Sequence, residues 1–311
     1  MLPFSFFDAH CDTLSCCAHR GWNLADAPGH VDLRRGAQFE HYAQIFAIFQ
    51  DSALSPAGGM PAECRRQAEV FHRQLACSRE QIMQVRSGTG LKHAAETRRI
   101  AALLSVEGAE LLDCSPAQLD WAREQGVVMI NLTWNHANAL SGSNLEQPQR
   151  GLSPQGRDFV RRAQALGILI DVSHLSDPGF WDLMDLTEQP VVASHSDARA
   201  LCAHPRNLTD EMFRALREHG GFVGLNFYRL FLGRDGSLDA VFAHLEHFLE
   251  LGGEKTLGFG GDWDGCDALP DGIRGIQDMD RIYDKMLQRN YSSELIEDLF
   301  YRNLKRVLFE R

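Results

Sequence analysis

The chain alternates short apolar runs, rich in β-branched residues, with longer stretches in which apolar residues recur at helical spacing. Eight runs are predicted to be strands: residues 6–12, 43–50, 100–108, 127–134, 168–174, 190–196, 221–227 and 256–264. Helices are expected at about residues 60–87, 116–125, 153–166, 178–187, 209–219, 237–251 and 279–308, the last in one or two pieces. Nearly continuous apolar strands separated by helices are typical of a parallel sheet whose outer face is covered.

Eight strand-then-helix units predict an α/β fold of the TIM-type (β/α)8 barrel class, for which about 250 residues is typical. The competing doubly wound open sheet would carry a glycine-rich phosphate turn after its first strand, whereas the first run here ends in Asp8, His10 and Asp12. No internal repeat or convincing linker interrupts the sequence, and residues 51–60 and 142–154 are predicted to be long loops. We therefore expect a single domain over residues 1–311.

Composition narrows the classes of partner and location. The chain has 31 Lys and Arg against 42 Asp and Glu, a formal net charge of −11, which argues against nucleic acid and membrane surfaces as partners. The amino terminus carries no positively charged leader, and no run approaches the roughly 20 apolar residues of a spanning helix, so a cytoplasmic location is expected. The eight cysteines contain no Cys-x-x-Cys pair, which favours reduced, structural thiols.

Several apolar runs end, on their carboxyl side, in a residue that can bind a metal ion or move a proton. In a barrel these ends form the active face. His10 and Asp12 close the first run, and residues two apart on a strand point to the same side. Glu107, His174 and His195 close the third, fifth and sixth runs. Each alone is explained by a capped strand end or a core histidine, but together they form a ligand set suited to Zn²⁺ or a similar divalent ion.

Five ligands exceed what one tetrahedral zinc ion uses, so two Zn²⁺ ions are expected. Glu107 is the best bridge, because it lies between the first pair and the two histidines in barrel order. Two metals about 3.5–4 Å apart can hold a bridging hydroxide and polarise a carbonyl, which is the chemistry of amide hydrolysis. The eighth run ends in GFGGDWDG, where Asp262 is favoured for proton transfer and Asp264 for stabilising the loop.

At these residues the sequence resembles the membrane (renal-type) dipeptidase family, peptidase family M19, within the amidohydrolase-like barrels. The resemblance covers nearly the whole chain, in family order, through DAHCDT, SVEG, LTWNHAN, GLSPQGRDFVRRAQALGILIDVSHLSD, PVVASHSDARALCAHPRNLTDE and GFGGDWDG. It implies a zinc-dependent dipeptidase, commonly a homodimer, that cleaves the peptide bond of dipeptides. The roles it implies are His10 and Asp12 on one zinc ion, His174 and His195 on the other, Glu107 bridging, and Asp262 as acid and base.

The resemblance also concerns the substrate. It implies that Arg206, in HPRN, receives the carboxylate of the dipeptide, a task suited to a planar bidentate donor. The family places a substrate-contacting histidine after the Leu-Thr of the fourth strand, where this chain has Trp134, with His136 two residues later. Either His136 reaches the substrate through a shifted loop or that contact is replaced.

Two other functions stay open. One keeps the barrel and changes the substrate to a cyclic amide or a lactone, or makes the enzyme a deaminase. Many such enzymes bridge their metals with a carboxylated lysine after the fourth strand, and no lysine stands between Val127 and Leu152. The other is a catalytically silent binding barrel, against which the presence of all five ligands and Asp262 argues.

Overall fold

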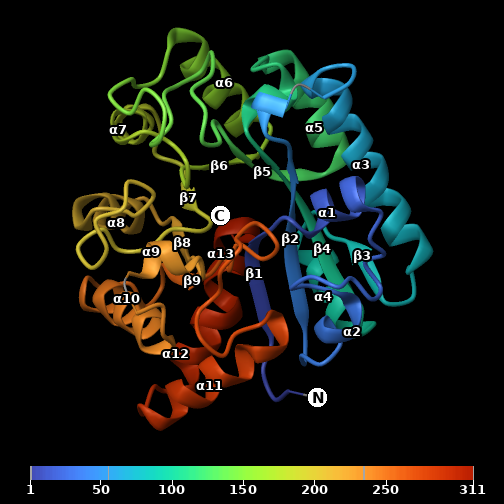
Figure 1. Ribbon diagram of the computed structural model, residues 1–311, viewed down its shortest axis with the longest axis vertical. Helices are drawn as coiled ribbons and strands as arrows, with labels where there is room; N and C mark the ends of the chain where they lie inside the picture. Colours follow the sequence, from blue (N-terminus) through green and yellow to red (C-terminus); the bar gives the residue numbers. More distant parts are fainter. Residues whose placement is uncertain (1, 55, 234, 311) are drawn as a thin grey trace.

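The computed structural model contains one sheet of nine parallel strands, eight of which close into a barrel with helices around it (Figure 1). The strands are β1 (Phe6–Cys11), β2 (Tyr42–Phe49), β3 (Ile82–Gln84), β4 (Ile100–Glu107), β5 (Val127–Asn131), β6 (Leu169–Asp171), β7 (Val192–Ala193), β8 (Phe222–Leu225) and β9 (Leu257–Phe259). Their order is β2-β1-β9-β8-β7-β6-β5-β4-β3, and the pairing of β2 with β4 closes the ring. The predicted (β/α)8 barrel is therefore confirmed, and its eight strands are the eight predicted runs.

The structure describes residues 2–54, 56–233 and 235–310. Met1 and Arg311, the ends of the predicted domain, and Ser55 of the predicted loop 51–60 lie outside the described residues. None of the helices in these described ranges is long and apolar enough to cross a lipid bilayer.

The helices are α1 (Thr13–Arg20), α2 (Leu33–Gly36), α3 (Met60–Cys77), α4 (Gly88–Glu96), α5 (Leu119–Gln125), α6 (Pro154–Ala165), α7 (Asp177–Leu186), α8 (Asp210–Glu218), α9 (Arg229–Leu232), α10 (Leu238–Glu250), α11 (Met279–Gln288), α12 (Ser293–Glu297) and α13 (Asn303–Phe309). The short 3₁₀ segments are η1 (Ser52–Leu54), η2 (Ala109–Leu112), η3 (Pro116–Gln118) and η4 (Ile276–Asp278). A π-helical turn, η5 (Asp298–Arg302), joins α12 to α13. Local capping explains several starts: Ser153 accepts from the Gly156 N–H at the beginning of α6, and Ser176 accepts from Gly179 in α7.

The predicted helix at 60–87 is wrong beyond Cys77. There α3 ends, and residues 82–84 instead form β3, which pairs with the amino-terminal half of β4. A three-residue strand is too short to show period-two alternation, so Ile82 and Met83 fit the helical spacing equally well. Helices α1 and α4 were not predicted from the sequence. The predicted segment 279–308 forms separate helices, as expected, with a break between α11 and α12.

Alternation along β4 explains how one carboxylate reaches the end of the barrel. Ala101 and Leu103 belong to one apolar cluster, while Ala102, Leu104 and Val106 belong to another. Because successive side chains point to opposite faces of a strand, Glu107 continues the line of Ala101 and Leu103. The whole strand is buried, so this carboxylate emerges at the carboxyl end of the barrel and away from bulk water.

Candidate active site

A cavity of about 410 Å³ lies at the carboxyl ends of the barrel strands. Seven of the residues singled out in the sequence line it: Asp12, Glu107, Trp134, His174, Arg206, Asp262 and Asp264. His10 and His195 are fully buried, with ring centroids 4.0 Å apart, and both contact Glu107. The structure thus brings together all five predicted metal ligands, as well as Asp262 and Arg206.

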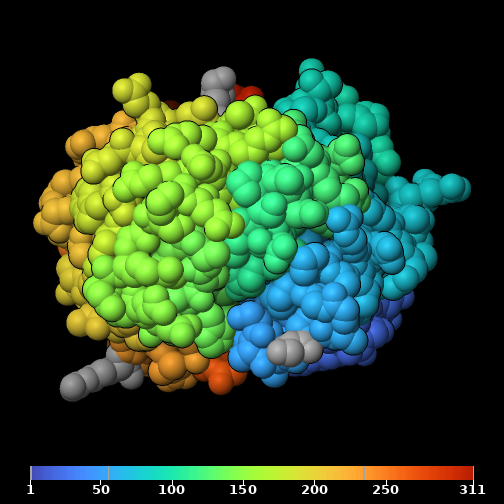
Figure 2. All heavy atoms as spheres, turned by 90° about the horizontal axis from the view of Figure 1, so that it is seen from above, coloured from blue at the N-terminus to red at the C-terminus, as the bar shows by residue number. Residues whose placement is uncertain are grey.

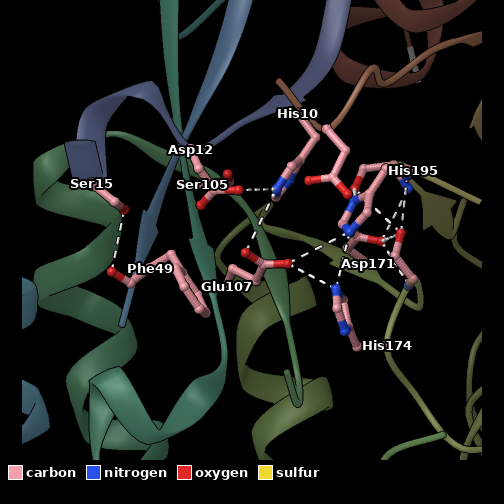
Figure 3. A network of polar contacts seen from close by, with 12 residues as sticks. His10, Asp12, Ser15, Phe49, Ser105, Glu107, Asp171, His174 and His195 are labelled. Carbon is pink, nitrogen blue, oxygen red and sulfur yellow. Dashed lines mark hydrogen bonds and ion pairs between the residues drawn. The ribbon is translucent and has the colours of Figure 1, made fainter. Parts of the chain in front are cut away.

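Three potential ligand atoms converge from β4, β6 and β7 (Figure 3). Nε2 of His174 lies 2.9 Å from Oε1 of Glu107 and 3.0 Å from Nε2 of His195. The remaining side of this triangle, from His195 Nε2 to Glu107 Oε1, measures 3.5 Å. All three residues are at most 5% exposed, so water cannot easily separate them.

The other nitrogen of each ring fixes its tautomer. Nδ1 of His195 lies 2.7 Å from Ser194 Oγ, whose own hydrogen goes to the Asp171 carboxylate, so Nδ1 must donate. Nδ1 of His174 lies 3.0 Å from Asn135 Oδ1 and donates to it, while Arg206 Nη2, which can only donate, faces Nε2 at 3.0 Å. Both Nε2 atoms therefore direct lone pairs, not protons, toward Glu107.

His10 and Asp12 form the other half of the cluster, on β1 and just beyond it. Nε2 of His10 lies 3.5 Å from Asp12 Oδ2 and 3.6 Å from Glu107 Oε2. Three buried atoms have no hydrogen-bond partner among the described residues: Nδ1 and Nε2 of His10 and Oδ1 of Asp12. Buried polar atoms normally find partners, so these atoms indicate a missing ligand.

Burial and charge act strongly on this cluster. Burial raises the pKa of Glu107 well above its usual range and lowers the pKa of His174 and of His195 well below theirs. Burial would also lower the pKa of His10, but the carboxylates of Glu107, Asp12 and Asp262 outweigh it and raise that pKa to about 10. The protein alone does not compensate the ionised cluster, and a bound cation would do so.

Divalent cations fit this donor set. Two groups of ligand atoms each lie within 4.8 Å of one another: His10, Glu107 and His195, and His10, Asp12 and Asp262. Tetrahedral zinc with ligand distances near 2.1 Å sets neighbouring ligand atoms roughly 3.4 Å apart, close to the separations of 2.9–3.6 Å found between these side chains. Imidazole and carboxylate are also the ligand types that zinc accepts. The residues present therefore fit divalent metal ions.

Asp262 and Asp264 have different surroundings, as the sequence suggested. Oδ2 of Asp262 accepts from Asn226 Nδ2 at 3.1 Å, on the cavity side of the cluster. Asp264 accepts from the Thr13 hydroxyl and from the His30 N–H, both at 2.6 Å, and so ties α1 and the 29–30 loop to the end of the barrel. Among the described residues Oδ1 of Asp262 has no hydrogen-bond partner, while both oxygens of Asp264 are engaged in holding loops.

Arg206 is 3% exposed and lies against the metal cluster. Its Nη1 donates to the Ser173 carbonyl, Nη2 faces His174 Nε2, and the guanidinium lies 5.3 Å from the centre of the Phe231 ring. A fixed cation at the wall of the cavity is suited to an anionic substrate group.

His136 does not line the cavity in this structure, whereas Trp134 and Asn135 do. Its Nε2 lies 3.3 Å from Asp51 Oδ1 and its Nδ1 3.2 Å from Glu146 Oε2, so both nitrogens are used by neighbouring loops. The Trp134 ring lies 6.2 Å from that of His174. The position beside the metal cluster is therefore filled by an indole rather than an imidazole.

Sequence reasoning missed the residues that hold the ligands in place. Asp171 accepts from the N–H and hydroxyl groups of both Ser173 and Ser194, and so joins the two histidine-bearing strand ends. A side chain on Gly260 would collide with the Ser194 carbonyl, so glycine lets β9 approach this loop closely.

Asp8 joins the strand end that carries His10 to the loop that follows β9. It accepts from the His10 N–H and Gln44 at one oxygen, and from the Gly261 N–H and Trp263 Nε1 at the other. Burial raises its pKa to about 6 in spite of these four donors. The sequence did contain a signal for this role: Asp8 stands inside an apolar run, where a carboxylate cannot be explained as a solvated surface residue and needs buried partners.

Comparisons with known proteins agree on one family. The sequence profile described as membrane dipeptidase (peptidase family M19) matches residues 1–310. A Klebsiella pneumoniae protein described as "Uncharacterized protein in pqqA 5'region" is 32% identical over 255 residues, 78% of this chain and 94% of its own length. A Claviceps purpurea protein named dipeptidase tcpJ is 28% identical over 300 residues, 92% of this chain and 70% of its own length.

The crystal structure of a metallopeptidase from Rhodobacter sphaeroides, liganded with a phosphinate mimic of the dipeptide L-Ala-D-Ala, superposes on this chain with a TM-score of 0.89. The two chains are 25% identical, and the match covers 98% of each.

Proposed function

The chain belongs to the membrane dipeptidase family, peptidase family M19, and is a metallo-dipeptidase of that family; we propose that it hydrolyses the peptide bond of dipeptides with two zinc ions. One observation carries the proposal: the Nε2 lone pairs of His174 and His195 and the carboxyl group of Glu107 converge at separations of 2.9–3.5 Å, and neither imidazole directs a proton into the space between them. The Rhodobacter sphaeroides metallopeptidase binds a mimic of L-Ala-D-Ala, which supports a dipeptide as the substrate of this chain.

In this proposal His10 and Asp12 would hold one ion, His174 and His195 would hold the other, and Glu107 would be shared, as the family resemblance implies. When bound, the ions supply a nucleophilic water at neutral pH and polarise the scissile carbonyl. The protein contributes rigid ligands, because each is buried and held by groups such as Asp8 and Asp171.

Asp262 is the acid and base of the proposal. Asn226 holds one carboxylate oxygen, which leaves Oδ1 to take a proton from the attacking water. The same oxygen then delivers the proton to the nitrogen of the departing amino acid, so that an amine and a carboxylic acid are released.

Arg206 binds the carboxylate of the dipeptide. A nitrogen lone pair serves one partner, so a cation on His174 Nε2 leaves the Arg206 Nη2 donor, now 3.0 Å from that nitrogen, free for the substrate. The Nη1 bond to the Ser173 carbonyl keeps the guanidinium in position.

The test is a panel of L,L and L,D dipeptides, assayed after treatment with chelator and again after addition of zinc. We expect chelation to abolish hydrolysis and zinc to restore it, with close to two equivalents of metal per chain. A protein that binds metal and cleaves none of the panel would overturn the dipeptidase proposal and favour a cyclic amide or lactone. The homodimer, the cytoplasmic location and the single domain stay predictions.

A further inference from the structure

Three exposed leucines line the cavity. Leu54, Leu145 and Leu230 are 70%, 49% and 62% exposed, and they come from η1 after β2, from the loop after β5 and from α9 after β8. Exposed apolar side chains gathered at a cavity are a mark of a binding surface rather than of chance. Separate loops therefore bring apolar side chains to the mouth of the same site.

Two of these leucines belong to an apolar wall that reaches the metal cluster. Phe49 and Trp134 also line the cavity, with ring centroids 4.8 Å apart, and Trp134 lies 6.2 Å from the His174 ring. Leu54 follows Phe49 along the chain by five residues, and Leu145 lies on the long loop after Trp134. We call Phe49, Leu54, Trp134 and Leu145 the apolar wall.

The Phe49 end of the wall is held in place before any substrate arrives. The Phe49 N–H donates to Gln67 Oε1 at 3.1 Å, and Gln67 Nε2 donates back to the Phe49 carbonyl at 2.6 Å. Gln67 is fully buried on α3, so these hydrogen bonds fix the backbone of Phe49 to the protein interior. A rigid surface selects more sharply than one that must be ordered by its ligand.

His136 connects the two loops that carry the leucines. It contacts Asp51 at 3.3 Å and Glu146 at 3.2 Å, each next to or near a leucine of the wall. In Figure 2 the light-blue segment around residues 50–54 borders the green segment that follows β5 on the same face. The Asp51 carboxylate also accepts from the Ala53 N–H, so it is engaged rather than offered to a substrate.

We propose that the apolar wall selects dipeptides that carry a large apolar side chain. This rests on the proposed dipeptidase function and specifies its substrate class. A side chain of Leu or Phe size would cover the wall and lose contact with water, whereas a charged or amide side chain packed against these four apolar residues would lose hydration that they cannot replace. His136 acts as a positioning residue that holds the wall together.

The experiment compares kcat/KM for two series of dipeptides, X–Ala and Ala–X, in which X is Leu, Phe, Gln, Lys or Glu. In one series we expect Leu or Phe to exceed Gln by on the order of tenfold or more, the usual effect of filling an apolar pocket. The other series serves as the internal reference and shows which residue of the dipeptide meets the wall.

The variant is the double substitution Leu54→Gln with Leu145→Gln, at positions exposed enough to leave folding intact. It should lower the ratio of kcat/KM between Leu and Gln substrates by about tenfold. The matched control is Leu287→Gln, which removes a leucine that is 44% exposed on α11 and outside the cavity. The control should keep the wild-type ratio.

The outcomes separate this inference from the function on which it rests. Dipeptides cleaved with no apolar preference, or with a preference that survives in the double variant, overturn the inference and leave the dipeptidase intact. If nothing is cleaved, calorimetric binding of Ala–Leu and Ala–Gln decides. If Ala–Leu binds more strongly than Ala–Gln and this difference is lost in the double variant, the inference about the apolar wall stands although the proposed dipeptidase activity is wrong. Equal binding of the two dipeptides, or no binding, overturns both proposals.

Discussion

The hydroxyl of Ser194 lies 2.7 Å from Nδ1 of His195, and its hydrogen is donated to the buried carboxylate of Asp171. This chain of contacts fixes the tautomer in which Nε2 of His195 presents a lone pair to the cavity. The sequence segment DVSH therefore supplies both His174, a proposed metal ligand, and the carboxylate of Asp171 that orients His195, the proposed ligand after the next strand.

Substituting Ser194→Ala should weaken zinc binding by about 10- to 100-fold, because His195 loses the partner that fixes its tautomer and orientation. A competition titration with a chromophoric chelator measures this affinity directly and does not depend on turnover. Activity at saturating zinc should fall much less than activity at limiting zinc.

Ser196→Ala is the matched control for Ser194→Ala. Ser196 is buried in the same segment, but among the described residues its hydroxyl has no hydrogen-bond partner, so no contact is lost. The control should bind zinc as tightly as the wild type. Equal zinc affinity in the Ser194→Ala and Ser196→Ala proteins would show that the hydroxyl does not orient His195.

Glu107→Gln should remove at least one equivalent of metal and lower kcat by about 10³-fold or more, since several kcal/mol of charge stabilisation depend on the ions. In the metal-free state the opposite trend is expected for stability. Burial disfavours the ionised carboxylate of Glu107, and a neutral amide avoids this cost, so metal-free Glu107→Gln should melt at a higher temperature than metal-free wild type.

Metal analysis and calorimetric melting, with and without chelator, test both parts. Glu110→Gln makes the same chemical change three residues along, at a carboxylate that accepts from Asn138 and does not line the cavity. Its metal content should match the wild type. Two metals retained by Glu107→Gln, at an unchanged rate, would remove Glu107 from the site.

The strand ends could be predicted from the sequence because the barrel rule needs only local information. Near-continuous apolar runs identify strands, and a ligand-type residue at the carboxyl end of each run falls on one face of the fold. His10, Glu107, His174 and His195 were found in this way, and the structure brings them together.

The supporting contacts could not be predicted because their partners are distant along the chain. Asp8 contacts Trp263, 255 residues away, and nothing near Asp8 indicates this. β3 was missed for a different reason, since three residues carry too little pattern to separate a strand from a helix. His136 shows a third limit: its loop placed it against Asp51 and Glu146, a result of tertiary contacts alone.

Arg206→Lys should weaken recognition of the substrate carboxylate, because a lysine ammonium lacks the planar pair of donors. Loss of one charge-assisted hydrogen bond is worth about 1.5–3 kcal/mol, so KM for Ala–Leu should rise by about 10-fold or more. The same substrate with its carboxylate replaced by an amide serves as the comparison, measured by steady-state kinetics. If Arg206 binds the carboxylate, the variant loses little on the amide; an equal loss on both substrates would assign Arg206 a role other than carboxylate recognition.

His244, outside the metal cluster, makes stability depend on pH. It is 1% exposed, and its Nδ1 accepts from the Ala198 N–H at 3.0 Å. Burial is the main cause that lowers its pKa from 6.5 to about 4, so the folded protein holds this imidazole neutral where the unfolded chain protonates it. Stability from this group is therefore complete above pH 6.5 and is lost as pH falls toward 4, by up to about 3 kcal/mol.

His244→Asn separates this effect from the titration of the metal ligands, because an asparagine oxygen can accept from Ala198 but does not titrate. Urea unfolding of both proteins in chelator, from pH 7.5 to 4.5, gives the difference in their free energies of unfolding at each pH. Contributions from the distant metal ligands are common to both proteins and cancel in this difference. The advantage of the wild type at pH 7.5 should shrink steadily below pH 6.5, because the unfolded wild-type chain takes up a proton at residue 244 that the folded chain does not, and the variant has no such titration. A difference that stays constant across this range would mean that His244 has the same pKa in the folded and unfolded chains, contrary to its burial.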